Sequence, residues 1–234
     1  MNRNSNTYTI VYATVMVILV AIGLAFTSQA LREDQKRNED IDKMQQILSA
    51  LNIHVTPEEA MEKYDSVITD AFLVDSEGNV VEGTNGKGVD SPAFTYALAE
   101  IKNSDKVPVF LANVDGAQKH VLGMYGAGLW GPIWGYISVN DDKNTIFGAN
   151  FSHAGETPGL GAEITTEHFY SQFEGKELYK DGEFKSVAVV KSGHSAPGQD
   201  YVDGISGGTL TSQGVHHMLY DSLKKYDNYL SKKD

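Results

Sequence analysis

The sequence predicts an α+β protein in which a single N-terminal transmembrane helix precedes a mostly antiparallel sheet domain with flanking helices. Three observations support this fold class. An uncharged, largely apolar stretch occupies residues 4–31. Apolar runs joined by polar, glycine-containing turns follow between residues 68 and 153, which is the pattern of hairpins. Helical periodicity flanks these runs on both sides, and strands grouped between helices are typical of α+β proteins.

The first predicted element is a membrane anchor over residues 1–31. Residues 10–26 are nearly all apolar, and with their neighbours they approach the ~20 residues that a bilayer span needs. A cleaved signal peptide is the alternative, because Ser28-Gln29-Ala30 fits a small-x-small cleavage site. Only Arg3 precedes the apolar core, however, and the core is longer than the ~7–15 residues usual in signal peptides. We therefore favour a retained anchor.

The charges after the anchor specify its orientation only weakly. Arg32, Lys36 and Arg37 are mixed with Glu33 and Asp34. The positive-inside rule counts the basic residues and slightly favours a cytoplasmic location for the segment after the anchor, although a large acidic domain can translocate regardless.

A helical connector is predicted over residues 32–55 and a folded domain over residues 56–234. The connector carries apolar residues at three- and four-residue spacing, namely Ile41, Met44, Leu48 and Leu51. The folded domain opens with Thr56-Pro57-Glu58-Glu59, a capping threonine followed by proline and acids, which marks a helix start.

Three hairpins are predicted next, over residues 68–83, 107–125 and 134–153. Asp115-Gly116 is the turn of the second hairpin, and residues 141–144 form the turn of the third. A short helix over 167–173 and a strand over 184–192 follow. The last helix places one apolar face toward the core, formed by Val215, Leu219, Leu223, Tyr226 and Leu230.

Composition excludes several classes of function. The net charge of −12 over 234 residues disfavours nucleic acid as a partner, because an acidic surface repels phosphate backbones. The absence of cysteine excludes disulfides, zinc thiolate sites and cysteine-ligated iron–sulfur clusters. The seven histidines are scattered, and no metal site is expected.

Two glycine-rich stretches are candidates for ligand-binding loops. Gly126–Gly131 reads literally as G-x-G-x-x-G, but Pro132 and a strand follow it where a dinucleotide-binding fold requires a helix. It is a bend with room for a flat ligand, beside Trp130 and Trp134. The second stretch, residues 153–164, is either a strand-to-helix connection or a binding loop with Glu156 and Thr157 at its tip.

The segment 203–215, "DGISGGTLTSQGV", directly precedes the last helix and admits three interpretations. It can be a plain loop, an anion site at a helix N-terminus, or a serine nucleophile in the G-x-S-x-G pattern around Ser206. No histidine follows Asp221, and residues 195–205 look like a loop rather than the strand of a nucleophile elbow. The glycines and hydroxyls favour a phosphate-bearing group, and Asp203 suits a base that activates a hydroxyl.

Three motifs together resemble a known family. "DGISGGTLTS" looks like the flavinylation motif Asp-x-x-Ser/Thr-Gly-Ala-Thr, and "GETPGLG" and "GAGLWGPIWGYI" are similar to two further motifs of the same proteins. With the single span and the length, the chain resembles the C subunits of sodium-translocating NADH:quinone oxidoreductases. The G subunits of the related Rnf electron-transport complexes are a close second.

The resemblance implies a covalent FMN, joined to a threonine through a phosphoester by a separate flavin transferase. Thr209 matches the flavinylated position. Gly208 stands where the motif usually has alanine, which leaves Thr211 as a second possibility for the ester. The other implied cofactor-binding residues are Asp203, Ser206, Gly207, Leu210, Glu156, Thr157, Leu160, Gly161, Leu129 and Trp130.

The resemblance also implies a function and a location. The chain would be a single-pass protein of the bacterial inner membrane, with its flavin domain on the periplasmic face. FMN would relay electrons from an iron–sulfur centre in neighbouring subunits to the flavin of the B subunit, in a complex that reduces ubiquinone and exports sodium. The B, D and E subunits, the flavin transferase and membrane lipid are the implied partners. A non-covalent module that binds FMN or another phosphate ligand, and a hydrolase that uses Ser206, are the alternatives.

Overall fold

The computed structural model describes residues 6–232, and the chain divides into two compact units, residues 1–42 and 43–234. Helix α1 (Asn6–Ser49) runs through the predicted boundary at residue 31 without a break. Its apolar side chains between Ile10 and Phe26 are exposed, and α1 is the one helix within residues 6–232 that is long and apolar enough to cross a membrane. The first five residues of the predicted anchor lie outside the described range.

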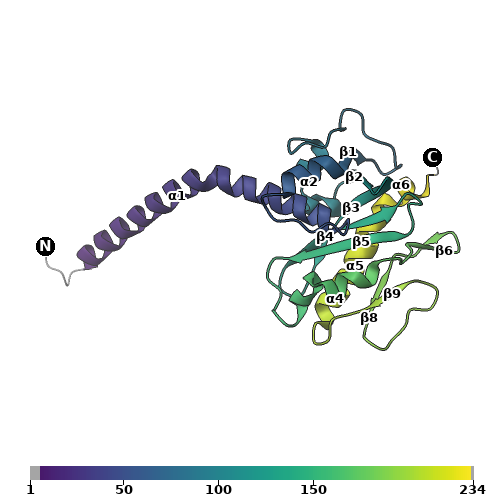
Figure 1. The fold of residues 1–234 in the computed structure, drawn as a ribbon. Helices are drawn as coiled ribbons and strands as arrows, with labels where there is room; N and C mark the ends of the chain where they lie inside the picture. Colours follow the sequence, from purple (N-terminus) through teal and green to yellow (C-terminus); the bar gives the residue numbers. More distant parts are fainter. Residues whose placement is uncertain (1–5, 233–234) are drawn as a thin grey trace. The chain divides into compact units, whose positions relative to one another are not determined.

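The second unit is built on a five-stranded sheet (Figure 1), and its antiparallel pairing confirms the predicted sheet type. Its strands follow one another in space in chain order: β1 (Ile68–Val74), β2 (Val107–Val114), β3 (Ala117–Ala127), β4 (Pro132–Asn140) and β5 (Ile146–His153). The register pairs Val109 with Leu122 and Leu122 with Ile137. Short turns join β2 to β3, β3 to β4 and β4 to β5, whereas the longer segment 75–106 joins β1 to β2.

The predicted second and third hairpins are both present. Asp115 and Gly116 have φ angles of 51° and 82°, so both central residues of the β2–β3 turn are left-handed, as a type I′ turn requires. In the β4–β5 turn, one carboxylate oxygen of Asp142 accepts from the N–H groups of Asn144 and Thr145 at 2.9 and 2.8 Å. Local side-chain chemistry therefore fixes this turn.

The predicted first hairpin, residues 68–83, is wrong in its second arm. Strand β1 pairs with β2, and the returning segment contributes an isolated bridge between Val74 and Val80. Only Val80 and Val81 are apolar before Glu82-Gly83, so the segment is too short to bury a face. The chain then continues to α3 (Pro92–Thr95) and the 3₁₀ helix η1 (Leu98–Lys102).

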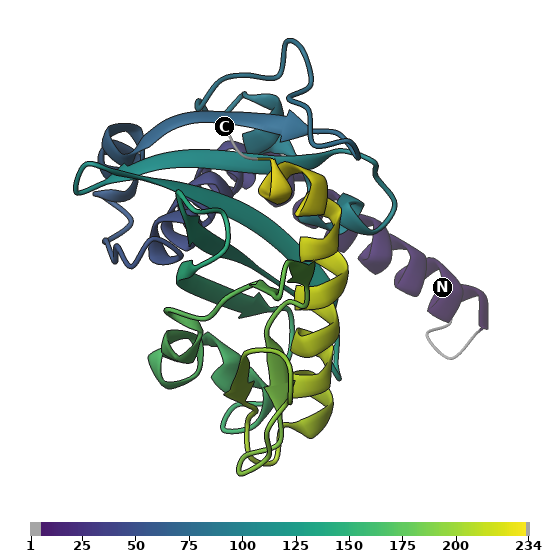
Figure 2. The same ribbon diagram turned by 90° about the vertical axis from the view of Figure 1, so that its right-hand side faces the viewer.

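Both faces of the sheet are covered. Helix α5 (Thr209–Leu223) crosses one face and packs mainly on β3, as Figure 2 shows for the yellow C-terminal helix. Val215, Leu219 and Leu223 are buried in the core there, as the sequence predicts. On the other face, the last turns of α1 and helix α2 (Ala60–Val67) contribute Leu48 and Tyr64. The predicted helix start at Thr56 is a turn, and α2 begins four residues later.

Short elements complete the fold around α5. Helix α4 (Glu167–Tyr170) and the 3₁₀ helices η2 (Gly161–Thr165), η3 (Ser171–Phe173) and η4 (Lys224–Tyr226) are joined by α6 (Asp227–Ser231). Strands β6 (Tyr179–Lys180) and β7 (Glu183–Phe184) form a small hairpin, whereas β8 (Ala188–Val190) and β9 (Tyr201–Asp203) pair in parallel. The prediction that residues 195–205 lack a strand is wrong, because β9 pairs with β8, in which Ala188 is the partner of Tyr201.

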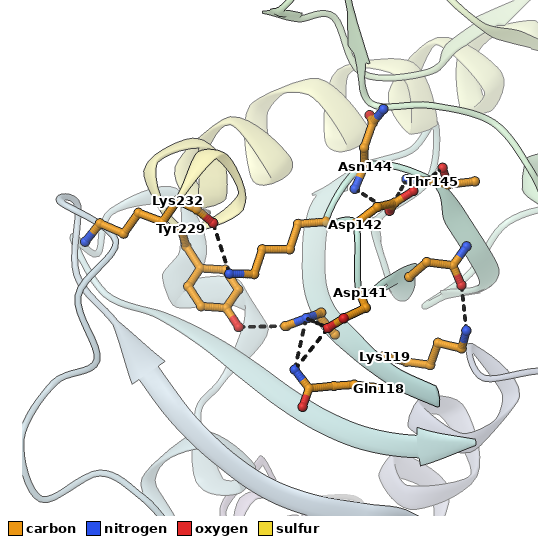
Figure 3. Close-up of polar contacts among 11 residues, drawn as sticks. Gln118, Lys119, Asp141, Asp142, Asn144, Thr145, Tyr229 and Lys232 are labelled. Atoms are coloured by element: carbon orange, nitrogen blue, oxygen red, sulfur yellow. Dashed lines mark hydrogen bonds and ion pairs between the residues drawn. The ribbon is translucent and has the colours of Figure 1, made fainter. Parts of the chain in front are cut away.

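A polar network closes the end of the sheet where β3 begins and β4 ends (Figure 3). The Tyr229 hydroxyl lies 2.7 Å from Nδ1 of the buried His120, and Nζ of Lys143 donates to the carbonyl of Lys232 at 3.1 Å. These contacts tie α6 to β3 and to the β4–β5 turn. The network therefore anchors the C-terminal helix, and it lies at the opposite end of the β3–β4 hairpin from the turn that joins these two strands.

Candidate functional site

The first turn of α5 places Thr209 at the surface. Gly208 is the N-cap residue and provides no side-chain cap, so within residues 6–232 the first N–H groups of the helix have no side-chain acceptor. Thr209 is the first helical residue, its side chain is exposed, and its hydroxyl has no hydrogen bond within residues 6–232. A free hydroxyl beside unpaired backbone donors is suited to a phosphate group.

The turn before Thr209 depends on glycine. Gly207 has a φ of 76°, and a Cβ atom there would lie 2.7 Å from Cδ2 of Leu160. At Gly208 a Cβ atom would lie 3.1 Å from Cβ of Ile205, so an alanine fits only if Ile205 shifts by a few tenths of an ångström. The hydroxyl of Ser212 accepts from the N–H of Ile205 at 2.9 Å and fixes the turn from the helix side.

Glu156 joins the three predicted motifs. Its side chain is 5 % exposed, and its two carboxylate oxygens accept from the backbone N–H of Trp130 at 2.9 Å and from the hydroxyl of Thr211 at 2.6 Å. A Cβ atom at Gly161 would lie 2.4 Å from both Glu156 Oε2 and Thr211 Oγ1. The β3–β4 turn, the 153–161 loop and α5 therefore meet at this carboxylate.

Four large apolar side chains near these loops are exposed, namely Leu129, Trp130, Leu160 and Leu210. Trp130 is 69 % exposed although its backbone N–H is fixed by Glu156. Exposed apolar side chains gathered at the loops of a folded domain mark a binding surface more often than chance. The predicted partner of Trp130, Trp134, is not part of this surface, because its Nε1 donates to Gln46 at the end of α1.

Three further predicted site residues, Asp203, Ser206 and Thr157, make no side-chain hydrogen bond to Glu156 within residues 6–232. Asp203 ends β9, and its side chain and that of Ser206 are exposed without a hydrogen bond within residues 6–232. Thr157 is exposed at the tip of its loop, where its carbonyl accepts from the N–H groups of Leu160 and Ala162. The structure thus unites Glu156, Gly161 and Thr211 directly and leaves Asp203, Ser206 and Thr157 at the rim.

Gln172 is a member of the site that the sequence motifs do not reveal. Its amide accepts from the N–H of Asp203 at 2.9 Å and donates to the carbonyl of Asp203 at 3.4 Å. The amide therefore makes the two hydrogen bonds that a neighbouring strand would make along the free edge of β9. No pattern in the sequence connects the two residues, because 31 positions separate them.

The serine-hydrolase interpretation lacks a base. Within residues 6–232, no hydrogen bond joins Ser206 to a histidine. The nearest histidine in sequence, His216, uses Nδ1 to accept from the N–H of Val189 at 3.3 Å. Burial and the neighbouring His217 lower the pKa of His216, and Asp221 only partly opposes them. His216 is therefore a neutral acceptor that holds β8 against α5.

A cavity of about 410 Å³ lies along α5 behind the β3–β4 turn. Its lining includes Tyr125, Ala127, Gly214, Met218 and Ser222, and it includes none of the predicted site residues. A Cβ atom at Gly214 would lie 2.3 Å from the carbonyl oxygen of Ala127, so helix and strand are in close contact at the edge of this cavity.

Comparisons with known proteins assign the family of the chain. Residues 128–224 match the family model of the FMN-binding domain, and this range includes the β3–β4 turn, the 153–161 loop and the start of α5. The class defined by fold and site is therefore an FMN-binding domain preceded by an apolar helix. The chain belongs to the family of the C subunit of the Na(+)-translocating NADH-quinone reductase.

Three relatives carry this assignment. The C subunit of the Vibrio vulnificus reductase is 30 % identical over 213 residues, which cover 86 % of this chain and 84 % of the relative. The crystal structure of the C subunit from Parabacteroides distasonis is 54 % identical, with a TM-score of 0.82, and the match covers 87 % of this chain and 98 % of that one. Shewanella oneidensis NqrC is 27 % identical with a TM-score of 0.64, over 82 % of this chain and 98 % of that one.

Proposed function

We propose that this chain is the flavoprotein C subunit of a sodium-translocating NADH:quinone reductase, and that FMN is attached to Thr209 through a phosphoester. The observation that carries the attachment site is the contrast between two threonines. Thr209 is exposed with a free hydroxyl, whereas Thr211 is 1 % exposed and donates its hydroxyl to Glu156. An ester at Thr211 would break that hydrogen bond and require a buried phosphate.

The residues present fit FMN. The unpaired N–H groups in the first turn of α5 would hold its phosphate. Leu129, Trp130, Leu160 and Leu210 would contact the flat, largely apolar ring system. Gly207 and Gly208 keep side chains away from the attachment point. Asp203 and Ser206, exposed at the rim, stay accessible to the flavin transferase.

FMN, when bound, supplies one- and two-electron transfer. We infer that the chain acts as an electron carrier between neighbouring subunits, with B, D and E as its contacts, and that the flavin domain lies on the periplasmic side of the inner membrane. Family membership supports a place in the multi-subunit complex, and the α1 helix supports attachment to the membrane, whereas the periplasmic side rests on the resemblance alone. A covalent tether would retain the cofactor at an open surface where non-covalent contacts are few.

Intact-mass measurement tests the attachment site. Wild type, Thr209→Val and Thr211→Val chains are produced together with the flavin transferase. We expect the wild type and Thr211→Val to gain the mass of FMN less water, and Thr209→Val to gain none. A denaturing gel separates covalent from non-covalent binding, because only a covalent flavin leaves a fluorescent band. If Thr209→Val still gains this mass, the assignment to Thr209 is wrong.

A further inference from the structure

The Glu156 carboxylate occupies a slot between two glycines. A Cβ atom at Gly128 would lie 2.4 Å from Oε1, and a Cβ atom at Gly161 would lie 2.4 Å from Oε2. Both positions must lack a side chain for the carboxylate to fit. The backbone of Glu156 is held in place as well, because its N–H donates to Nδ1 of His153 at 3.2 Å.

The hydrogen-bond partners of this carboxylate are neutral. Its two oxygens accept from a backbone N–H and a hydroxyl, and within residues 6–232 no ion pair involves Glu156. A buried charge without a counter-ion is costly unless hydrogen bonds compensate it. The carboxylate is an acceptor at both oxygens, so it can bind two donors from different segments at once, and charge-assisted hydrogen bonds are stronger than neutral ones.

These two donors belong to two segments that each carry residues of the proposed FMN site. The Trp130 N–H lies in the β3–β4 turn, and the Thr211 hydroxyl lies two residues after Thr209 on α5. The 153–161 loop contributes Glu156 between them. Within the turn that carries Trp130, the N–H of Gly128 donates to the carbonyl of Gly131 at 2.8 Å.

We propose that Glu156 is the positioning residue of the site, which fixes the Trp130 turn relative to the first turn of α5. The proposal rests on the proposed function for its consequence in cofactor attachment. Glu156 contacts backbone and hydroxyl groups of this chain rather than the flavin. It also engages the Thr211 hydroxyl, and thereby leaves Thr209 as the free hydroxyl of the helix start.

Fluorescence anisotropy of the full chain in detergent, produced without the flavin transferase, tests the positioning. The chain has two tryptophans, so Trp134→Phe isolates Trp130, and Trp130→Phe isolates Trp134 as the matched control. Trp134 is held by Gln46 on the other face of the sheet. We expect Glu156→Ala to lower the anisotropy of Trp130 and to leave that of Trp134 unchanged.

Conservative variants separate positioning from a general loss of stability. Glu156→Gln keeps the length of the side chain and can accept from Trp130 while its amide donates to Thr211, so it should restore the Trp130 anisotropy. The Glu156→Asp side chain is too short to reach both donors, so this variant should not restore the Trp130 anisotropy. It also keeps the test valid if Glu156→Ala fails to fold. An unchanged Trp130 anisotropy in folded Glu156→Ala and Glu156→Asp, or an equal loss at both tryptophans, would overturn the proposal.

Cofactor attachment provides the second measurement. With the flavin transferase present, we expect Glu156→Ala to acquire FMN several-fold more slowly than wild type, and Glu156→Gln to acquire it at nearly the wild-type rate. Equal rates in all three chains would contradict the proposal. If the wild type gains no covalent FMN, the proposed function fails instead, and the anisotropy result from the flavin-free chain still decides the role of Glu156.

Discussion

At the scale of single residues, the site depends on where side chains are absent. Gly128, Gly161 and Gly207 each leave room for a neighbouring side chain, and the neighbours are Glu156, Thr211 and Leu160. The sequence motifs identify these glycines but give no reason for them. The structure supplies the reason, because each glycine borders one of the three segments that meet at the site.

Gly207→Ala provides a test of this packing at one position. The substitution places a side chain in the left-handed region, which costs roughly 1–2 kcal/mol, and also drives Leu160 from its position. Gly198→Ala is the matched control, because Gly198 has a φ of 84° but no atom within 4 Å of the added Cβ. Urea unfolding should show a larger decrease in the free energy of unfolding for Gly207→Ala than for Gly198→Ala. Equal decreases would mean that the Leu160 side chain moves aside without destabilising the protein.

The structure also clarifies the effect of Gly208, the residue that replaces the usual alanine of the flavinylation motif. In the sequence, glycine in place of alanine at position 208 leaves Thr211 as a second possibility for the ester. In the structure, Gly208 has a φ of −106° that any residue adopts, and an added methyl would press against Ile205. The engagement of Thr211 by Glu156, rather than residue 208, distinguishes the two threonines.

At the scale of elements, local patterns predicted most of the fold. The β2–β3 and β4–β5 hairpins and the buried face of α5 follow from turn residues and periodicity, which act over a few positions. The wrong predictions concern strands whose pairing depends on a partner outside the local sequence pattern. Strand β1 pairs with β2 rather than with its own return segment, and β9 forms because β8 is beside it. The contact of Glu156 with Thr211 spans 55 positions and was equally out of reach.

The free edge of β9 depends on Gln172. Gln172→Leu removes both hydrogen bonds to the Asp203 backbone, which should destabilise the protein by about 1–2 kcal/mol and slow FMN attachment at Thr209. Gln172→Glu retains the acceptor for the Asp203 N–H and should therefore be destabilised less than Gln172→Leu. Thermal unfolding and the rate of mass gain measure the two effects. A Gln172→Leu chain with wild-type attachment would show that the β9 edge needs no support.

The β4–β5 turn should make stability depend on pH. Burial alone would raise the pKa of Asp142, but the Thr145 hydroxyl and the N–H groups of Asn144 and Thr145 outweigh it and lower the pKa. The carboxylate therefore stabilises the fold above its unfolded pKa of about 4, and this contribution disappears as pH falls through the lower folded value. Asp142→Asn should cost about 1 kcal/mol at pH 7 and progressively less in acid.

The neighbouring Asp141 provides the control for this prediction. Its side chain is exposed, and its contacts with His120 and Gln118 are long, at 3.8 and 3.4 Å. Asp141→Asn should therefore change the unfolding free energy little at any pH. Chemical denaturation of both variants between pH 7 and pH 3 makes the comparison. A constant difference between wild type and Asp142→Asn across that range would contradict the assigned role.

At the scale of the whole molecule, the two units are expected to behave differently in water. The unit from residue 43 onward has a core of its own, with both sheet faces covered, whereas the apolar side chains between Ile10 and Phe26 are exposed. A bilayer is the environment that removes such a helix surface from water. The sequence predicts an anchor over residues 1–31 from charge and hydropathy alone, because membrane insertion depends on the composition of a segment rather than on its tertiary contacts.

A truncated chain of residues 43–234 tests this division. We expect it to be soluble without detergent, to unfold cooperatively by circular dichroism, and to acquire FMN on Thr209 when the transferase is present. The full chain should stay with the membrane fraction after an alkaline carbonate wash. A truncated chain that aggregates, or a full chain released by carbonate, would show that the units depend on one another or that α1 does not anchor the protein.

The slot around Glu156 has a consequence for how such sequences can diverge. Positions 128, 156, 161 and 211 lie in three separate motifs, yet one carboxylate and two missing side chains make them a single packing unit. A lineage that replaces the glutamate by a shorter residue removes the contact that most strongly excludes alanine at 128, whereas alanine at 161 would still meet the Thr211 hydroxyl. Substitutions among homologues are therefore expected in a preferred order, with position 156 changing before 128, and positions 156 and 211 both changing before 161.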